Sequence, residues 1–452
     1  MRRVAAVVLA VLIAAVLTAP RAHASGCPAR RAVTGRLPGV TPAQETLAYW
    51  LRVTGTRHDL DRPLLHARDA ARQKAVAARF GADAGVLLAP PDERAVRAQV
   101  ASLLDLLHQR AARGRWLDAS GHPLDTSRLP RADAASLVLA PHVRVALART
   151  LLRCMPLPRA LRDAGDADRT DDVNACSAVA PQEAVQTLAD GPGTLRLART
   201  RSALGWIAAD APLSPPAGAG RRRGRAFLGD RRVRAAIYAA APGPPRGRIE
   251  VPAGTLLPLA PGRTDRVLIA TRDGVAEARR PAGLRAVPRI PTRRAVLTTA
   301  FAALGQPYGL GGAGGIDCSA LLQDAFAAAG VALPRHSADQ ARAGVLSVDL
   351  RGLTPAQRQV RLDAADARGL VLLHLPGHVA LYLGRNADGV PMTLHALGSY
   401  RTPCPDGRGE TRQVVRRVVV SRLDLGAGTR EGSLLERLDT LAVFGPSTAA
   451  PP

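Results

Sequence analysis

Residues 315–322 read Gly-Ile-Asp-Cys-Ser-Ala-Leu-Leu and follow directly on a glycine-rich loop, residues 309–315. Asp317 suits the N-cap of a helix, because its carboxylate can accept a hydrogen bond from a free N–H of the first turn. Cys318 then takes the first helical position, where the positive end of the helix dipole favours a thiolate. The apolar residues that follow predict a buried helix over residues 318–329. The stretch therefore predicts a cysteine nucleophile on a rigid helix, with an inert buried cysteine as the alternative.

A predicted hairpin further along the chain carries two histidines. His378 begins an alternating stretch typical of a half-buried strand, and a turn over residues 385–390 leads to a return strand with His395. On adjacent strands the two imidazoles can reach each other. His378 then suits a general base and acid for Cys318, with His395 as the group that orients it. The sequence thus predicts a Cys–His–His site for covalent catalysis.

Two other kinds of site would use some of the same residues. The glycines of residues 309–315 match a dinucleotide fingerprint by letter, but no strand of Val or Ile precedes them. A loop that lets backbone approach the thiol explains these glycines better. A zinc site of His374, His378 and His395 lacks a carboxylate at suitable spacing, and the Pro-Gly at residues 376–377 forbids a helix between the first two. We therefore expect no metal and no cofactor.

Five segments together resemble the NlpC-type (NlpC/p60) family of cell-wall cysteine peptidases. They read Pro-Tyr-Gly-Leu-Gly-Gly (307–312), Gly-Ile-Asp-Cys-Ser (315–319), Leu-Pro-Arg-His-Ser (333–337), Gly-His-Val-Ala-Leu-Tyr-Leu-Gly (377–384) and Leu-His-Ala (394–396). The resemblance covers roughly residues 295–445. It implies a papain-like α+β domain in which Cys318, His378 and His395 are catalytic. It also implies cleavage of peptidoglycan stem peptides, commonly between D-glutamate and diaminopimelate.

The same resemblance assigns further residues. Tyr308 takes the place of a tyrosine that shapes the oxyanion site, where the backbone N–H of Cys318 would be a second donor. Asp317, Ser319 and Arg335 match positions that line the substrate groove. The chain departs from the family pattern with Leu310 for Trp, Ala320 for Gly and Leu370 for Asp, and with His336 where enzymes selective for a free N-terminal L-Ala often carry Asp. The last departure leaves the requirement for a free amine open.

The region before this domain resembles bacterial SH3-like modules more weakly, around residues 172–206 and 254–259. Short strands are predicted at residues 184–188, 204–208 and 267–271, and helices through Val96–Leu107 and through Val143, Leu147 and Leu151. A linker is predicted at residues 212–224. The predicted organisation is a signal peptide (1–24), a helical stabilising region (25–149), two SH3-like barrels (150–218 and 219–290), a papain-like peptidase domain (291–446) and a disordered tail (447–452). Later strands are predicted at residues 370–373, 379–383, 393–396 and 414–420.

The first residues indicate export. Arg2 and Arg3 precede an apolar run that ends at Ala19, and Ala-His-Ala at residues 22–24 suits signal peptidase. The run is shorter than the roughly 20 residues of a membrane span, so no transmembrane segment is expected in the mature protein. Residues 24–27, Ala-Ser-Gly-Cys, resemble a lipoprotein cleavage box, which leaves a lipid anchor at Cys27 open. We expect a periplasmic or cell-envelope protein, with an outer-membrane lipoprotein as one form of it.

Cysteine usage and charge complete the prediction. Five cysteines in an exported chain leave at least one free thiol, and Cys154 and Cys176 are close enough to join, whereas the partner of Cys404 stays open. The 452 residues carry a formal charge of +25, which alone would suggest nucleic acid. All basic residues but Lys74 are scattered arginines, and no nucleic-acid-binding motif is present, so nucleic acid is not expected as a partner. A non-catalytic wall-binding protein and an acyltransferase remain the competing function classes.

Overall fold

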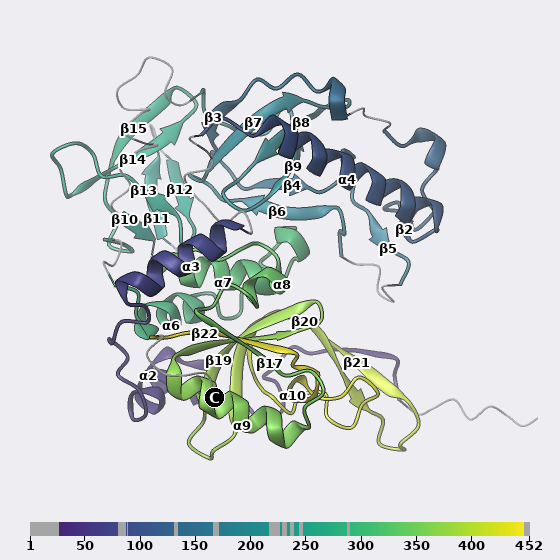
Figure 1. Cartoon of the computed structure of the whole chain (residues 1–452), viewed down its shortest axis with the longest axis vertical. Coiled ribbons are helices and arrows are strands. Elements are labelled where there is room, and N and C mark those ends of the chain that lie inside the picture. Colours follow the sequence, from purple (N-terminus) through teal and green to yellow (C-terminus); the bar gives the residue numbers. More distant parts are fainter. Residues whose placement is uncertain are drawn as a thin grey trace, which may run out of the picture.

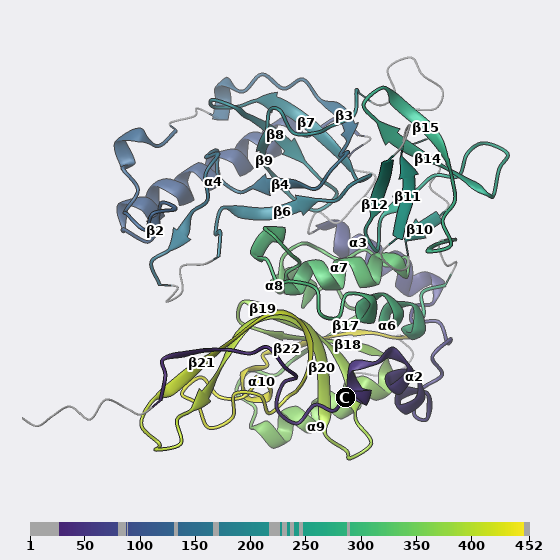
Figure 2. The ribbon, with the colours of Figure 1, turned by 180° about the vertical axis from the view of Figure 1, so that it is seen from behind.

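The computed structural model describes residues 27–79, 87, 89–130, 134–165, 171–216, 227, 233–235, 239–243, 247–286 and 290–446. These residues form a C-terminal unit of helices and one large sheet, and two β units that lie against its helices, as Figures 1 and 2 show from opposite sides. The predicted signal peptide, most of the predicted linker and the predicted tail lie outside the described residues.

A seven-stranded sheet forms the centre of the C-terminal unit, with strand order β1-β21-β20-β19-β18-β22-β17. Its strands are β1 (Arg30–Ala32), β17 (Leu346–Asp349), β18 (Leu370–Leu375), β19 (His378–Arg385), β20 (Pro391–Pro403), β21 (Glu410–Arg422) and β22 (Thr440–Phe444). β1 pairs in parallel with β21, and the other neighbours are antiparallel. All four strands predicted in this region are confirmed, each within a longer observed strand.

Helices cover both faces of this sheet (Figure 1). They are α6 (Arg293–Ala302) and α7 (Cys318–Ala328) on one face, α9 (Pro355–Arg368) and α10 (Leu434–Arg437) on the other, and the short α8 (Ser337–Gln340). Neighbouring residues of β18 enter opposite cores: Leu372 packs in the cluster of α6 and α7, and Leu373 in that of α9. Both side chains are fully buried, each contributing about 1.5–3 kcal/mol. The sheet therefore fixes α7 rigidly against β19 and β20.

The N-terminal segment packs on the C-terminal unit rather than forming a region of its own. Its helices are α2 (Leu47–Gly55) and α3 (Ala67–Arg79). Trp50 is fully buried in the core of α6 and α7, and the hydroxyl of Tyr49 accepts a hydrogen bond from the N–H of Ala387 at 3.1 Å. The next helix, α4 (Glu93–Ala112), packs instead on the first β unit. The predicted helical region 25–149 thus consists of two parts that contact different units.

The first β unit is a six-stranded antiparallel sheet with order β3-β7-β8-β9-β4-β6. Its strands are β3 (His142–Val145), β4 (Thr150–Arg153), β6 (Ala175–Val179), β7 (Ala184–Asp190), β8 (Leu195–Arg199) and β9 (Leu204–Ala208), with a small pair β2 (Trp116–Leu117) and β5 (Arg162–Asp163) beside it. The helix predicted through Val143, Leu147 and Leu151 is wrong. Those residues form β3, a turn and β4, because pairing with β7 and β6 overrides a coincidental helical spacing.

The predicted helix through Val96–Leu107 is confirmed as α4. Its apolar stripe, Val96, Val100 and Leu104, packs on Leu188 and Trp206 of the sheet. The strands predicted at residues 184–188 and 204–208 are confirmed as β7 and β9.

The second β unit is built from shorter strands. They are β10 (Val233–Ala235), β11 (Ala239–Gly243), β12 (Gly247–Val251), β13 (Leu256–Leu257), β14 (Arg266–Thr271), β15 (Gly274–Arg279) and β16 (Leu284–Ala286). They pair as β13-β10-β16, β11-β12 and β14-β15, and the strand predicted at residues 267–271 is confirmed within β14. Both units are built mainly of β-strands, as predicted; their SH3-like character stays a prediction.

Two disulfides tie segments together. Cys154 pairs with Cys176, a pairing that the sequence allowed but left open, and Cys27 pairs with Cys404. The second bond joins the segment before β1 to the loop between β20 and β21. Because the Cys27 thiol is used in this bond, the lipid anchor considered at that residue, and with it the outer-membrane lipoprotein, has no support. Within the described residues, no helix combines the length and apolarity that crossing a bilayer requires.

Candidate active site

The nucleophile candidate lies at the start of α7, as predicted. Asp317 caps the helix, because its carboxylate accepts a hydrogen bond from the N–H of Ala320 at 2.8 Å. All five cysteines are described, and Cys318 is the one that forms no disulfide. The backbone N–H of Val379 donates to its sulfur. This contact places the thiol against the beginning of β19, where His378 is the first residue.

The two histidines of the hairpin meet. Nε2 of His378 lies 2.7 Å from Nδ1 of His395, and Nε2 of His395 lies 3.1 Å from the hydroxyl of Ser421. Two opposite proton arrangements satisfy the row. In the one that leaves Nδ1 of His378 without a proton, His378 donates from Nε2 to His395, which donates from Nε2 to Ser421. Nδ1 of His378 is then the lone-pair nitrogen that can accept the proton of the thiol. The sequence predicted the first two members of this row but not Ser421, which reaches it through the pairing of β20 with β21.

The ionisation of the pair differs from the sequence-based expectation. Burial and the charge of Asp317 raise the pKa of the Cys318 thiol to about 12, against weaker lowering by backbone hydrogen bonds and Arg335. Burial, with the charges of Arg437 and His374, lowers the pKa of His378 to about 4. Burial also holds the pKa of His395 well below its ordinary value. The directions of these two shifts favour a neutral thiol and a neutral imidazole in the free protein, because burial disfavours the charged form of each group.

This ionisation state predicts slow alkylation of Cys318 by iodoacetamide at neutral pH. Only the thiolate reacts, and the thiol pKa of about 12 lies far above pH 7. The rate should therefore rise by about tenfold per pH unit between pH 7 and pH 10. His378→Ala should leave the slope unchanged, since burial and Asp317 set this pKa. A fast rate that is level from pH 5 to pH 8 and is lost in His378→Ala would instead show a thiolate–imidazolium pair.

Tyr308 stands before the glycine loop, next to the nucleophile helix. Burial, with the charges of Asp171, Cys318 and Asp317, raises its pKa, so its hydroxyl stays a proton donor. Its N–H donates to the carbonyl of Arg416, whose guanidinium lies 5.3 Å from the centre of its ring. That guanidinium pairs with Asp171 of the first β unit at 2.9 Å. The position of Tyr308 therefore depends on contacts from two units.

Asp317 and Arg335, which the resemblance placed in the substrate groove, form an ion pair that is 3% and 5% exposed. The guanidinium donates to both carboxylate oxygens, at 2.5 and 3.1 Å, and to the hydroxyl of Ser319 at 2.6 Å. Burial alone would raise the pKa of Asp317, but Arg335 and the hydrogen bonds hold it below its ordinary value. Their contacts support the start of α7, so their role as substrate-binding residues stays a prediction.

Arg335→Met should destabilise the protein by about 3–5 kcal/mol, because it leaves the charge of Asp317 buried and unpaired. The free energy of unfolding in urea measures the effect. Arg351→Met is the matched control, since it removes an arginine from an exposed pair with Asp349 and should leave the midpoint unchanged. Adding Asp317→Asn to Arg335→Met should restore part of the loss. Equal midpoints for the two single variants would contradict the assigned role.

Two other histidines near the site have separate surroundings. His336 is exposed at the start of α8 and makes no capping hydrogen bond with its side chain. His374 lies in β18, and its Nδ1 pairs with Asp439 at 2.6 Å. Among the described residues, no group of three or more His, Cys, Asp or Glu side chains could hold a metal ion.

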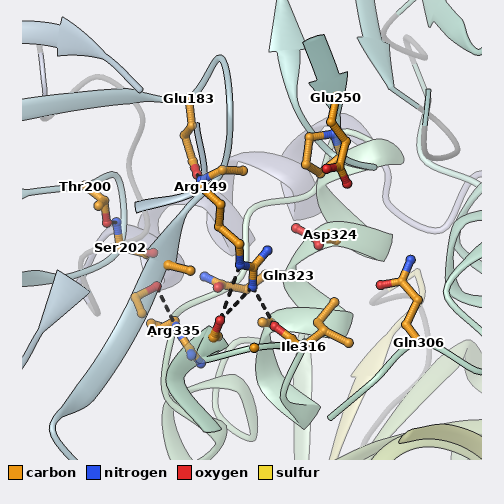
Figure 3. Close-up of a pocket in the computed structure, with 18 of the residues that line it drawn as sticks. Arg149, Glu183, Thr200, Ser202, Glu250, Gln306, Ile316, Gln323, Asp324 and Arg335 are labelled. Carbon is orange, nitrogen blue, oxygen red and sulfur yellow. Dashed lines mark hydrogen bonds between the residues drawn. The ribbon is translucent and has the colours of Figure 1, made fainter. Parts of the chain in front are cut away.

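A cavity of about 430 Å³ lies on the side of α7 that faces the β units (Figure 3). Its walls include Arg149 and Glu183 of the first β unit, Glu250 of the second, and Gln323 and Asp324 of α7. Burial raises the pKa of Asp324 to about 7. Cys318, His378 and His395 are not among its lining residues, so the cavity is distinct from the site of the proposed chemistry.

Comparison with known proteins finds a family match over this part of the chain. Residues 305–402 match the NlpC/P60 family and form an NlpC/P60 domain that contains Cys318, His378 and His395. Peptidoglycan endopeptidase RipB of Mycobacterium tuberculosis is 33% identical over 138 residues, which is 26% of this chain and 49% of that protein. The chain thus spans about half the length of the curated relative that it matches.

A solved structure extends the likeness of fold beyond the family domain. An NlpC/P60 endopeptidase from Photobacterium damselae subsp. piscicida superposes with a TM-score of 0.64 at 15% sequence identity. The superposition covers 85% of this chain and 94% of that one. At this identity the likeness shows the fold alone.

Proposed function

We propose that the chain is an exported cysteine endopeptidase that hydrolyses peptidoglycan stem peptides at the γ-D-glutamyl–diaminopimelate amide. The observation that carries the proposal is the free Cys318 at a helix start, beside the row His378–His395–Ser421, with the cysteine and both histidines inside the region that matches the NlpC/P60 family. The sequence similarity to a peptidoglycan endopeptidase supports a cell-wall substrate. A wall substrate in turn requires that the protein reach the envelope.

Acylation starts from the neutral pair. The sulfur of Cys318 attacks the amide carbonyl while its proton passes to Nδ1 of His378, so no free thiolate forms in the resting enzyme. The carbonyl oxygen becomes negative, and the hydroxyl of Tyr308 with the N–H of Cys318 would donate to it. His395 donates no proton to substrate; it holds the ring of His378 in the tautomer that accepts at Nδ1.

The second half of the reaction returns the groups to their starting state. The imidazolium of His378 gives its proton to the leaving amine, the C–N bond breaks and a thioester of Cys318 remains. His378, neutral again, takes a proton from water as the oxygen attacks the thioester. Collapse of that intermediate releases the carboxylate product, and Cys318 recovers its proton.

The charge of the chain suits such a substrate. Stem peptides and envelope polymers carry carboxylates, and a formal charge of +25 attracts anionic polymers at modest salt. The exposed His336 is the residue best placed in sequence to affect how the amino end of the stem peptide is recognised. Its imidazole cannot supply the fixed negative charge that an aspartate would offer a free amine.

The test uses purified muropeptides of known structure and mass spectrometry. Wild-type protein should release a fragment with a new free amine on diaminopimelate. Paired substrates with and without a free N-terminal L-Ala would measure the amine requirement. Binding to the wall without cleavage would favour a non-catalytic wall-binding protein. Transfer of the acyl group to an added amine in place of water would favour an acyltransferase.

A further inference from the structure

Arg149 reaches from the first β unit to the glycine loop that precedes the nucleophile (Figure 3). It is the residue immediately before β4. One terminal nitrogen donates to the carbonyl of Gly315 at 2.5 Å and to that of Gly312 at 3.0 Å, and Nε lies 3.3 Å from the Gly312 oxygen. A single side chain from another unit thus binds two carbonyls of the loop that ends at Cys318.

The peptide groups that Arg149 binds are connected to the reacting groups. The N–H of the Gly315–Ile316 peptide donates to the carbonyl of Pro307, next to Tyr308. The N–H of Gly309 donates to Ile316, and that of Gly311 to the carboxylate of Asp317 at 2.9 Å. The loop is therefore closed at its base beside Tyr308 and joined at its centre to the cap of α7. A shift of its outer carbonyls would be transmitted to both.

The first β unit also packs directly on this loop. Gly311 and Gly312 have positive φ, and a Cβ on Gly311 would lie 2.0 Å from the carbonyl oxygen of Ala175 in β6. The hydroxyl of Ser177, two residues further along, accepts a hydrogen bond from Nε of Arg335 at 3.1 Å. The contact is too close for any side chain between the loop and β6. The unit thus supports the nucleophile loop from outside.

We propose that Arg149 is a positioning residue for catalysis and that the first β unit is a working part of the active site. The kinetic test of this proposal rests on the proposed function, whereas its hydrogen-exchange test does not. Arg149 fixes the carbonyls of Gly312 and Gly315, and thereby the relative placement of Tyr308 and Cys318. Nε and one terminal nitrogen of the planar guanidinium share the Gly312 oxygen while that terminal nitrogen also reaches Gly315, a fixed geometry that an ammonium group does not reproduce. The exposed side of Arg149 faces the cavity described above, so a small guanidinium could enter if the side chain were removed.

The experiment compares Arg149→Ala, Arg149→Lys and Arg199→Met in the full chain. Arg199 is the matched control, since it also donates to a backbone carbonyl, that of Ala89 at 2.8 Å, within the same unit but away from the loop. Arg149→Ala should lower kcat by about tenfold to a hundredfold with KM within threefold, because small misplacements of reacting groups have effects of this size. Arg149→Lys should recover only part of the loss. Millimolar methylguanidinium should restore kcat of Arg149→Ala several-fold, and methylammonium should not.

Hydrogen exchange provides the readout that needs no substrate. Amides of residues 309–317 should exchange faster in Arg149→Ala and return toward the wild-type rate with methylguanidinium, whereas Arg199→Met should leave them unchanged. Unaltered exchange in this loop together with kcat within twofold of wild type would overturn the proposal. If wild type cleaves no muropeptide, the proposed function fails, and the exchange comparison still decides whether Arg149 holds the loop.

Discussion

Cys318→Ala should abolish cleavage of muropeptides, with a loss of at least about 10⁴-fold in kcat, because the acyl-enzyme has no other nucleophile to form on. The structure makes the result of this variant simple to interpret. The other four cysteines form two disulfides, so no second thiol in the chain can replace the lost one. Cleavage is followed by mass spectrometry of the released fragments, with wild type as the reference.

Two controls separate loss of chemistry from loss of fold. Cys318→Ser places a hydroxyl at the same buried position. It should be nearly as inactive, because a neutral imidazole activates a hydroxyl poorly unless the neighbouring groups are arranged for that reaction. Both variants should unfold within a few degrees of wild type, since each changes one small buried side chain. Titration of the unfolded, unreduced protein should find one thiol in wild type and none in the variants. Residual cleavage by Cys318→Ala at more than one hundredth of the wild-type rate would rule out the thiol mechanism.

The parts of the fold that could be predicted are those set by local pattern. The helix that starts at Cys318 and the hairpin of β19 and β20 each carry a strong signal: a cap and an apolar run for the first, alternation and an Asn-Ala-Asp-Gly turn for the second. The helix expected through Val143, Leu147 and Leu151 does not form, because a spacing of four residues also arises by chance in paired strands. No local sequence pattern predicts that Trp50 packs into the core of α6 and α7, because its partners lie about 250 residues away in sequence.

A similar division holds for the candidate site. Cys318, His378, His395 and Tyr308 could be named because they lie within recognisable motifs. Ser421 and Arg149 could not, since each reaches the site through a register or an interface between units. The pKa values of Cys318 and His378 could not be predicted from the sequence either. A helix start predicts a lowered thiol pKa, but burial of Cys318 and His378 reverses the expectation, and burial depends on tertiary packing between segments far apart in the sequence.

His378→Ala should lower kcat by about 10³-fold or more, approaching the effect of removing the thiol itself. Because the thiol is neutral in the free protein, its proton must leave during attack, and His378 is the group beside it that can accept. His395→Gln should have a smaller effect, about tenfold to a hundredfold, since it acts through the ring of His378. Ser421→Ala should be milder still. The order of these losses follows the order of the groups along the row from the sulfur.

The pH dependence gives this prediction a second, independent readout. Burial lowers the pKa of His378 to about 4, so the base stays neutral and able to accept a proton throughout mildly acidic pH. For wild type, kcat/KM should therefore hold level as pH falls toward 5 and decline only near pH 4. Residual activity in His378→Ala should instead rise with hydroxide concentration, because the thiolate must then form in solution without a neighbouring base. An acid limb near pH 6.5 in wild type, the ordinary pKa of an exposed histidine, would mean that His378 is more exposed to water than the structure has it.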